Sequence, residues 1–115
     1  MLDIKLIREN ADEVARALAK RGETVDFAEL LVWDKERREC IGRVTELRAR
    51  RKTVSADIPK LKKAGKDTAA LQAEMKTVGE TIKNLEGRLA EVEARIDAFM
   101  AMLPNLPAED VVPGG

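Results

Sequence analysis

The sequence contains no histidine and no tyrosine, and its only aromatic residues are two phenylalanines and one tryptophan. Histidine is the most common general base and metal ligand in enzymes, so its absence argues against catalysis within this chain. The chain also lacks a glycine-rich phosphate loop, a nucleophile beside a base and the Cys/His spacing of a metal site. We therefore expect no catalytic residue, no metal site and no cofactor in these 115 residues.

Cysteine and long apolar runs are equally scarce. The single cysteine, Cys40, excludes an internal disulfide, and we expect it to be a buried, reduced thiol. No apolar run approaches the roughly 18 residues of a membrane-spanning helix. The first ten residues lack the apolar core of a secretory signal. These absences predict a cytoplasmic protein with no membrane partner.

The most regular feature of the sequence is a set of positions spaced alternately by three and four residues, which we call the seam. All of its residues are apolar except Arg37 and Arg51. Its first half is Leu30, Trp33, Arg37, Cys40, Val44, Leu47, Arg51, Val54, Ile58 and Leu61. Its second half is Leu71, Met75, Val78, Ile82, Leu85, Leu89, Val92, Ile96, Phe99 and Leu103. This alternation is typical of a coiled coil, and two such helices joined by a short turn must run antiparallel.

The predicted fold is all-α: a long antiparallel two-helix coiled-coil hairpin with a short N-terminal helix packed at its base. One domain covers residues 1–103, and residues 104–115, rich in proline and glycine, form a linker. Within the domain we expect a base at 1–25, long helices at 26–63 and 68–103, and a tip turn at 64–67. Because Pro59 lacks an N–H group, we expect a kink or break between Ser55 and Lys60.

Capping signals set the expected helix ends. Residues 1–7 are short and mixed, which suggests a strand or a single turn. Asn10 resembles the N-cap of the short helix, and Gly22 resembles its C-terminal stop. Asp26 and Asp67 are placed to cap the two long helices.

The formal net charge is zero, yet the charges are segregated. Between Arg43 and Lys66 there are nine basic residues and two acidic ones, a local net charge of +7 that the rest of the chain balances with −7. The half of the hairpin near the turn is therefore predicted to be basic. A charged, solvated helix surface is the simplest interpretation of such a region. A surface that binds the phosphates of a folded RNA is the more specific one, since the rod has no aromatic platforms for single strands.

Pairing residues by their distance from the turn predicts the charges that meet along the hairpin. On one edge, Glu36 is expected near Arg95, and Arg43 near Arg88. On the opposite edge, Arg48 is expected near Glu86. Like charges that face each other mildly destabilise a hairpin, so facing arginines favour a role for this surface beyond hairpin stability.

Several segments, taken in order, resemble the start of bacterial seryl-tRNA synthetases. They are MLDI at 1–4 through IREN at 7–10, KRG at 20–22 with Asp26, LRARRKTVS at 47–55, and LPNLP at 103–107 followed by VPG at 112–114. The third segment is similar to the family's Leu-x-x-x-Arg-Asn-x-x-Ser run, except that Lys52 replaces the asparagine. The last is similar to the family's linker into its catalytic domain.

The resemblance implies the N-terminal tRNA-binding arm of a class II synthetase whose catalytic domain is absent here. In that family the arm reaches across a homodimer to the long variable arm and elbow of serine tRNA. The catalytic domain joins serine to that tRNA with ATP and magnesium. The fragment alone is expected to be monomeric, to bind tRNA and not to catalyse. The predicted tRNA-binding residues are Arg43, Arg48, Arg50, Lys52, Ser55, Lys60, Lys62, Lys63, Lys66, Lys76, Lys83 and Arg88.

The alternative function is a protein-binding hairpin, structural or chaperone-like, whose basic half meets an acidic partner. A chaperone-like hairpin would expose apolar residues near its tip. The predicted tip, by contrast, consists mostly of lysine, glycine and alanine.

Overall fold

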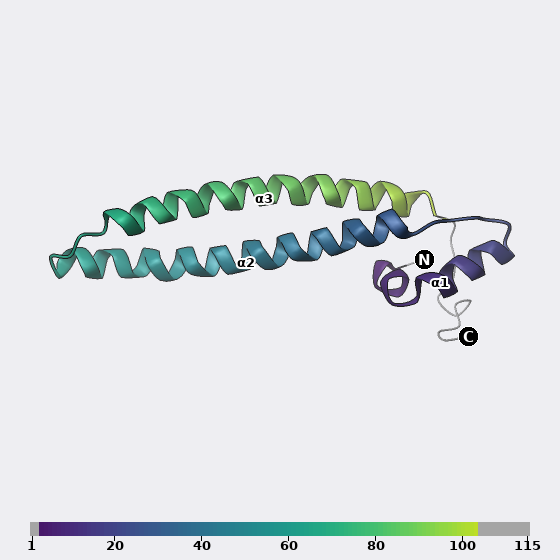
Figure 1. Ribbon diagram of the computed structural model, residues 1–115, viewed down its shortest axis with the longest axis horizontal. Helices are drawn as coiled ribbons and strands as arrows, with labels where there is room; N and C mark the ends of the chain where they lie inside the picture. The colour runs from purple at the N-terminus through teal and green to yellow at the C-terminus, as the bar shows by residue number, and fades with distance from the viewer. Residues whose placement is uncertain (1–2, 104–115) are drawn as a thin grey trace. The chain divides into compact units, whose positions relative to one another are not determined.

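The computed structural model describes residues 3–103 and contains three α-helices in this range (Figure 1). They are α1 (Ile4–Lys20), α2 (Ala28–Lys63) and α3 (Ala69–Ala101). The described residues include no strand, so the predicted all-α class is confirmed. None of these helices is long and apolar enough to span a membrane. The predicted linker at 104–115 lies outside the described residues.

The chain divides into two compact units. Unit 1 comprises Met1–Lys35 and Val92–Gly115, and unit 2 comprises Glu36–Glu91. Unit 2 is the predicted antiparallel hairpin, in which α2 and α3 run side by side on either side of a turn (Figure 1). Its core consists of the buried seam residues Val44, Leu47, Val78 and Ile82, with Met75 and Leu85 packed against them.

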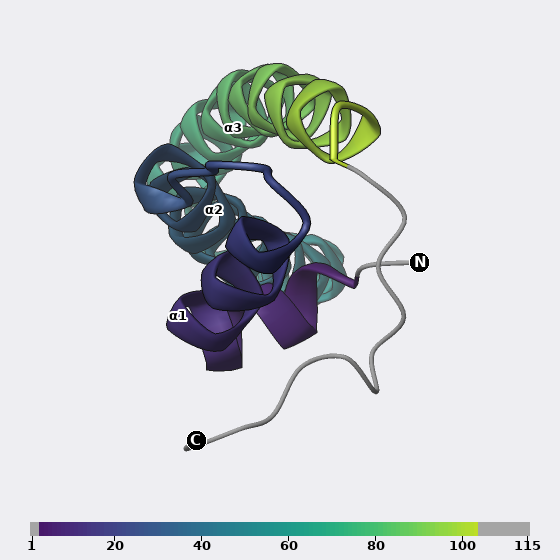
Figure 2. The same cartoon turned by 90° about the vertical axis from the view of Figure 1, so that its right-hand side faces the viewer.

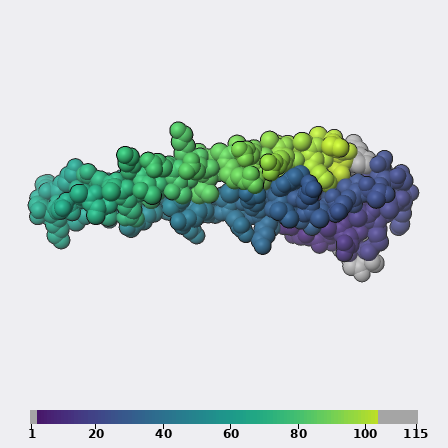
Figure 3. Space-filling view, turned by 45° about the horizontal axis from the view of Figure 1, so that its top comes forward, coloured from purple at the N-terminus to yellow at the C-terminus, as the bar shows by residue number. Residues whose placement is uncertain are grey.

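Burial along the rest of the hairpin follows the seam. Every apolar seam residue from Leu30 to Leu103 is buried or partly buried, whereas the seam arginine Arg51 is exposed. Cys40 is buried and free, as predicted. In the space-filling view, the surfaces of α2 and α3 meet along unit 2 (Figure 3). The 3-4 spacing therefore identified the packed surface correctly.

The N-terminal helix begins earlier than predicted. The carboxylate of Asp3 accepts a hydrogen bond of 2.9 Å from the backbone N–H of Lys5 and caps α1. The predicted strand or turn before Ile7 is therefore wrong. Asn10 has non-helical φ and ψ of −138° and 43° and lies at a kink between two helical segments of α1. A helical segment therefore begins after Asn10, where the sequence predicted one, and α1 changes direction part-way along (Figure 2). Tertiary contacts of Ile7 stabilise the first turns, which the local signals had not indicated.

The predicted helix ends elsewhere agree with the structure. Gly22, with φ of 82°, follows α1, and the N–H of Glu23 donates to the carbonyl of Leu18 at 3.0 Å. This is the left-handed glycine stop that the sequence indicated. The carboxylates of Asp26 and Asp67 accept hydrogen bonds of 2.9 Å from backbone N–H groups at the starts of α2 and α3.

The tip turn follows the same rule as the end of α1. Gly65 has φ of 77°, and the N–H of Lys66 donates to the carbonyl of Leu61 at 2.9 Å. Only glycine adopts this left-handed conformation without steric cost. The turn between Lys63 and Ala69 therefore lies where the sequence predicted it.

Pro59 does not break α2, which continues to Lys63. Of the predicted alternatives, a kink or a break, the break is wrong, for two physical reasons. Pro59 and Ser55 are both exposed, so water can satisfy the Ser55 carbonyl that loses its helical donor. Seam contacts hold the helix on both sides of the proline: before it, Val54 is 2% exposed and Ile58 is partly buried, and after it Leu61 is partly buried.

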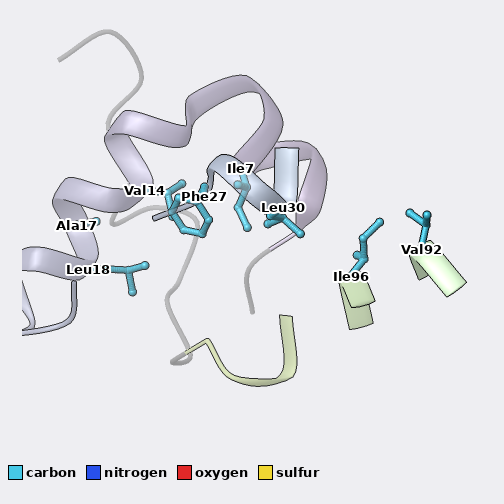
Figure 4. Packing of buried hydrophobic residues seen from close by; sticks show 8 residues of the cluster. All are labelled: Ile7, Val14, Ala17, Leu18, Phe27, Leu30, Val92 and Ile96. Carbon is cyan, nitrogen blue, oxygen red and sulfur yellow. The ribbon is translucent and has the colours of Figure 1, made fainter. Parts of the chain in front are cut away.

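Unit 1 contains the second core, where α1 packs against the start of α2 and the end of α3, as predicted. The buried cluster consists of Ile7, Val14, Ala17, Leu18, Phe27, Leu30, Val92 and Ile96 (Figure 4). The ring of Phe99 lies 6.1 Å from that of Phe27 and 6.2 Å from that of Trp33, centroid to centroid. The short helix thus obtains from tertiary packing the stability that it lacks alone.

One ion pair joins α1 to α2 in unit 1. The carboxylate of Asp34 is fully buried, and the guanidinium of Arg8 donates to both of its oxygens, at 2.6 Å and 3.2 Å. The hydrogen bond to Asp34 raises the pKa of Arg8 above its usual value. The bidentate geometry fixes the orientation of α1 on α2, and no local pattern in the sequence had indicated this pair.

The unit 1 core yields a stability prediction. Leu30→Ala removes a fully buried side chain and is expected to lower the free energy of unfolding by about 2–5 kcal/mol. Val32→Ala, on the same helix, is the matched control. Val32 is 63% exposed, so the change is expected to stay within about 0.5 kcal/mol. Urea unfolding measures both values, and equal losses would contradict the assignment of the core.

Candidate nucleic-acid interface

The helices of unit 2 meet along two edges, one on each side of the seam. The first edge is formed by residues that immediately precede seam residues. There the guanidinium of Arg88 donates to the two carboxylate oxygens of Glu36, at 2.5 Å and 3.0 Å. Arg50 donates in the same bidentate way to Glu74, at 3.1 Å and 3.2 Å. These hydrogen bonds raise the pKa values of Arg88 and Arg50 above the usual value.

These pairs correct the predicted register on the first edge. Glu36 pairs with Arg88 rather than with Arg95, which is seven residues further along α3. The predicted contact between Arg43 and Arg88 is also wrong. Arg43 instead pairs with Glu46 on its own helix at 3.3 Å. The seam repeats every seven residues, so its apolar pattern fits both registers, and the ion pairs distinguish them.

Arg43 and Arg88 do not face each other, so facing arginines no longer favour a role for this edge beyond hairpin stability. On α2, Arg43 lies midway between Glu36 and Arg50. On α3, Thr81 lies midway between their partners Arg88 and Glu74, so the register places Arg43 opposite Thr81. The first edge therefore pairs opposite charges. It stabilises the hairpin and supplies no excess positive charge.

The second edge is formed by residues that immediately follow seam residues. Arg48 of α2 pairs there with Glu86 of α3, as predicted. Seven residues nearer the turn on each helix, the same register places Ser55 opposite Gly79. Seam positions alternate between two kinds, and the second edge holds the residues that follow one of the two kinds. On each helix, the residues that follow the other kind, such as Lys52 and Lys83, lie beside this edge.

We call this side of unit 2 the basic face. Around the second edge it comprises Arg48, Lys52, Ser55 and Lys62 of α2, and Lys76, Gly79, Lys83 and Glu86 of α3. Five of its residues are basic and one is acidic. The residues that precede seam positions in unit 2, by contrast, include six acidic and four basic ones. The seam therefore separates a strongly basic side of the hairpin from a mixed one.

The lysines of the basic face are available to a partner. Lys52, Lys62, Lys76 and Lys83 are exposed and form no ion pair with any residue in the range 3–103. Arg48 is the one cation of the face with a carboxylate partner. An ammonium group without a carboxylate neighbour retains its full positive potential, which favours phosphate binding.

The predicted tRNA-binding residues thus fall into three groups. Arg48, Lys52, Ser55, Lys62, Lys76 and Lys83 lie together on the basic face. Arg43, Arg50 and Arg88 lie on the first edge, each paired with a carboxylate. Lys60, Lys63 and Lys66 are exposed near the tip turn but outside the basic face. Gly79, which no charge pattern marks, also lies on the basic face and was not among the predicted residues.

No group of three or more metal-ligating side chains lies together between residues 3 and 103. The basic face itself contains one carboxylate, that of Glu86. Its arrangement suits electrostatic binding of an anionic polymer.

Comparison with known families agrees with this geometry. The family model of the seryl-tRNA synthetase N-terminal domain matches residues 1–107. The chain belongs to this family. The match covers both units and confirms the family resemblance that the sequence segments indicated.

The curated relatives that the chain matches are longer than the chain itself. It is 41% identical over 114 residues to a serine–tRNA ligase of Symbiobacterium thermophilum, covering 99% of this chain and 27% of the relative. It is 45% identical over 114 residues to one of Aromatoleum aromaticum, with the same coverage. The chain therefore spans about a quarter of the length of these relatives.

The observed register predicts a charge-exchange result. Glu36→Arg places two cations opposite each other on the first edge and is expected to lower Tm. Adding Arg88→Glu restores the pair with its charges exchanged and is expected to recover most of the loss. Adding Arg95→Glu instead is the control and is expected to recover little. Thermal unfolding measures Tm for all three variants. The register would be contradicted if Tm recovered when Arg95→Glu, but not Arg88→Glu, was added to Glu36→Arg.

Proposed function

We propose that the chain is the tRNA-binding arm of a serine–tRNA ligase and that its basic face binds the long variable arm and elbow of serine tRNA. The observation that carries the proposal is the basic face, on which five cations and one carboxylate lie along a two-helix scaffold. Membership of the seryl-tRNA synthetase N-terminal domain family makes a serine tRNA the best-supported partner.

The chemistry of the face favours the backbone of a folded RNA. Lysine ammonium groups neutralise phosphates and release condensed counterions, which drives binding without reading bases. The face has no aromatic side chain on which unpaired bases could stack. Double-stranded RNA is recognised mainly through its shape, phosphates and 2′-hydroxyl groups. A tRNA with a long, base-paired variable arm presents such a surface.

The first-edge arginines have a different proposed role. Their carboxylate partners lower the positive potential that a phosphate would meet there. Arg50 and Arg88 therefore hold the two helices in register rather than bind tRNA. The tip residues Lys60, Lys63 and Lys66 add long-range attraction to the basic face.

The surface of the tip supports this function over a chaperone-like one. In the described part of unit 2, the only large apolar side chain with high exposure is Ile41, at 43%. Ile41 lies far along α2 from the tip turn. A hairpin that captures unfolded chains needs exposed apolar groups, and the tip presents lysines, Ala64 and Gly65 instead.

For the longer protein we propose the activity of its relatives: joining serine to tRNA with ATP and magnesium on a catalytic domain outside this chain. Homodimer formation and a cytoplasmic location are proposed on the same basis. The arm itself contributes binding and orientation of the tRNA. Its own residues take no chemical step.

The first functional prediction concerns tRNA selectivity. The chain is expected to bind a tRNA with a long variable arm at least tenfold more tightly than one with a short variable arm. The logarithm of the binding constant is expected to fall linearly with the logarithm of the salt concentration, with a slope near the roughly −0.9 per neutralised phosphate that holds for B-form DNA. Fluorescence anisotropy at several salt concentrations measures both. Equal affinities for the two tRNAs would contradict recognition of the variable arm.

A second prediction tests the face that binds. The double variant Lys52→Glu with Lys83→Glu reverses two cations of the basic face and is expected to weaken tRNA binding at least tenfold. The matched control, Arg43→Glu with Lys60→Glu, makes the same change in net charge on the other side of the seam. It is expected to weaken binding less than threefold. Circular dichroism verifies that both variants stay helical, and equal losses would contradict a binding face.

A further inference from the structure

Gly79 is a glycine that the fold does not require. It lies inside α3, where glycine destabilises a helix by about 1 kcal/mol relative to alanine. Its φ is not positive, so the backbone conformation does not demand glycine. A Cβ atom built on Gly79 would have no heavy atom within 4 Å, so packing does not demand it either.

The surroundings of Gly79 distinguish it from an arbitrary surface glycine. Lys76 and Lys83 lie three residues before and four residues after it, and thus flank it on the same side of α3. Across the second edge, the register places Ser55 opposite Gly79, and Lys52 lies one turn from Ser55. The smallest side chains of the basic face therefore lie together and are bordered by three lysines.

We propose that Gly79 and Ser55 form a close-approach site for one segment of the RNA backbone. The proposal rests on the function proposed above and adds a specific contact to it. The absence of a side chain at Gly79 lets a phosphate and its ribose approach the surface of α3 directly. Glycine often has this role where a backbone must come near a ligand.

Two kinds of interaction hold the RNA at this site. The ammonium groups of Lys52, Lys76 and Lys83 neutralise the phosphate charge, and the Ser55 hydroxyl donates a hydrogen bond to a phosphate oxygen. Coulomb attraction falls with distance, so a backbone that sits closer binds each lysine more strongly. A side chain at position 79 would hold the backbone away from these lysines and weaken every contact.

Gly87 is the matched control on the same helix. A Cβ atom there would likewise have no heavy atom within 4 Å. Gly87 lies on the side of α3 that faces away from the seam, between Glu86 and Arg88 and outside the basic face. Substitution at Gly87 therefore changes helix propensity without entering the proposed site.

The experiment compares substitutions at the two glycines. Gly79→Ala and Gly87→Ala are both expected to raise Tm, because alanine favours the helix. For a tRNA with a long variable arm, Gly79→Ala is expected to raise Kd at least threefold and Gly79→Leu at least tenfold. Gly87→Ala and Gly87→Leu are expected to stay within twofold of the unsubstituted chain. Thermal unfolding and fluorescence anisotropy measure the two quantities.

The outcomes separate this inference from the proposed function. Unchanged tRNA affinity in Gly79→Leu, together with lost affinity in Lys52→Glu with Lys83→Glu, would overturn the close-approach site and leave the function standing. Unchanged affinity in the lysine variant would overturn the function itself. A lower Tm in Gly79→Ala would show that the fold needs this glycine, and would also overturn the close-approach site.

Discussion

The antiparallel packing of the two seam halves is the constraint on which the rest of unit 2 depends. Burial of residues such as Val44, Leu47, Val78 and Ile82 holds two helices together that would be marginal alone. The same packing determines which residues follow the seam and which precede it. Every surface of the hairpin, including the one proposed to bind RNA, is therefore defined by its position relative to the seam.

Charge is distributed unequally across this division. Residues that precede the seam form ion pairs such as Glu36–Arg88 and Arg50–Glu74, which satisfy the arginines within the protein. Residues that follow the seam include Lys52 and Lys83, which no carboxylate of the described chain neutralises. One side thus supports the fold, and the other retains its charge for a partner. The zero net charge of the whole chain concealed this separation.

The errors of the sequence prediction have a common physical origin. The segment before Asn10 was expected to be a strand or a turn, yet burial of Ile7 favoured a helix that begins at Ile4. Pro59 is unfavourable inside a helix, yet its exposure and the neighbouring seam contacts allow α2 to continue. The register on the first edge differed from the prediction because the apolar seam repeats every seven residues. The two helices can therefore bury the same pattern when one is shifted by seven residues. In each case a local signal was overruled by contacts between distant residues.

Local spacing and capping in the sequence were enough to determine the two long helices, their antiparallel pairing, the buried seam and the turns at Gly22 and Gly65. These features depend on residues within a few turns of one another, so the chain records them directly. Only the tertiary structure decided the register across the first edge and the buried Arg8–Asp34 pair. It also gathered Lys52, Lys76 and Lys83 around Gly79. Those arrangements depend on how two helices align in space, and a periodic sequence leaves that alignment open.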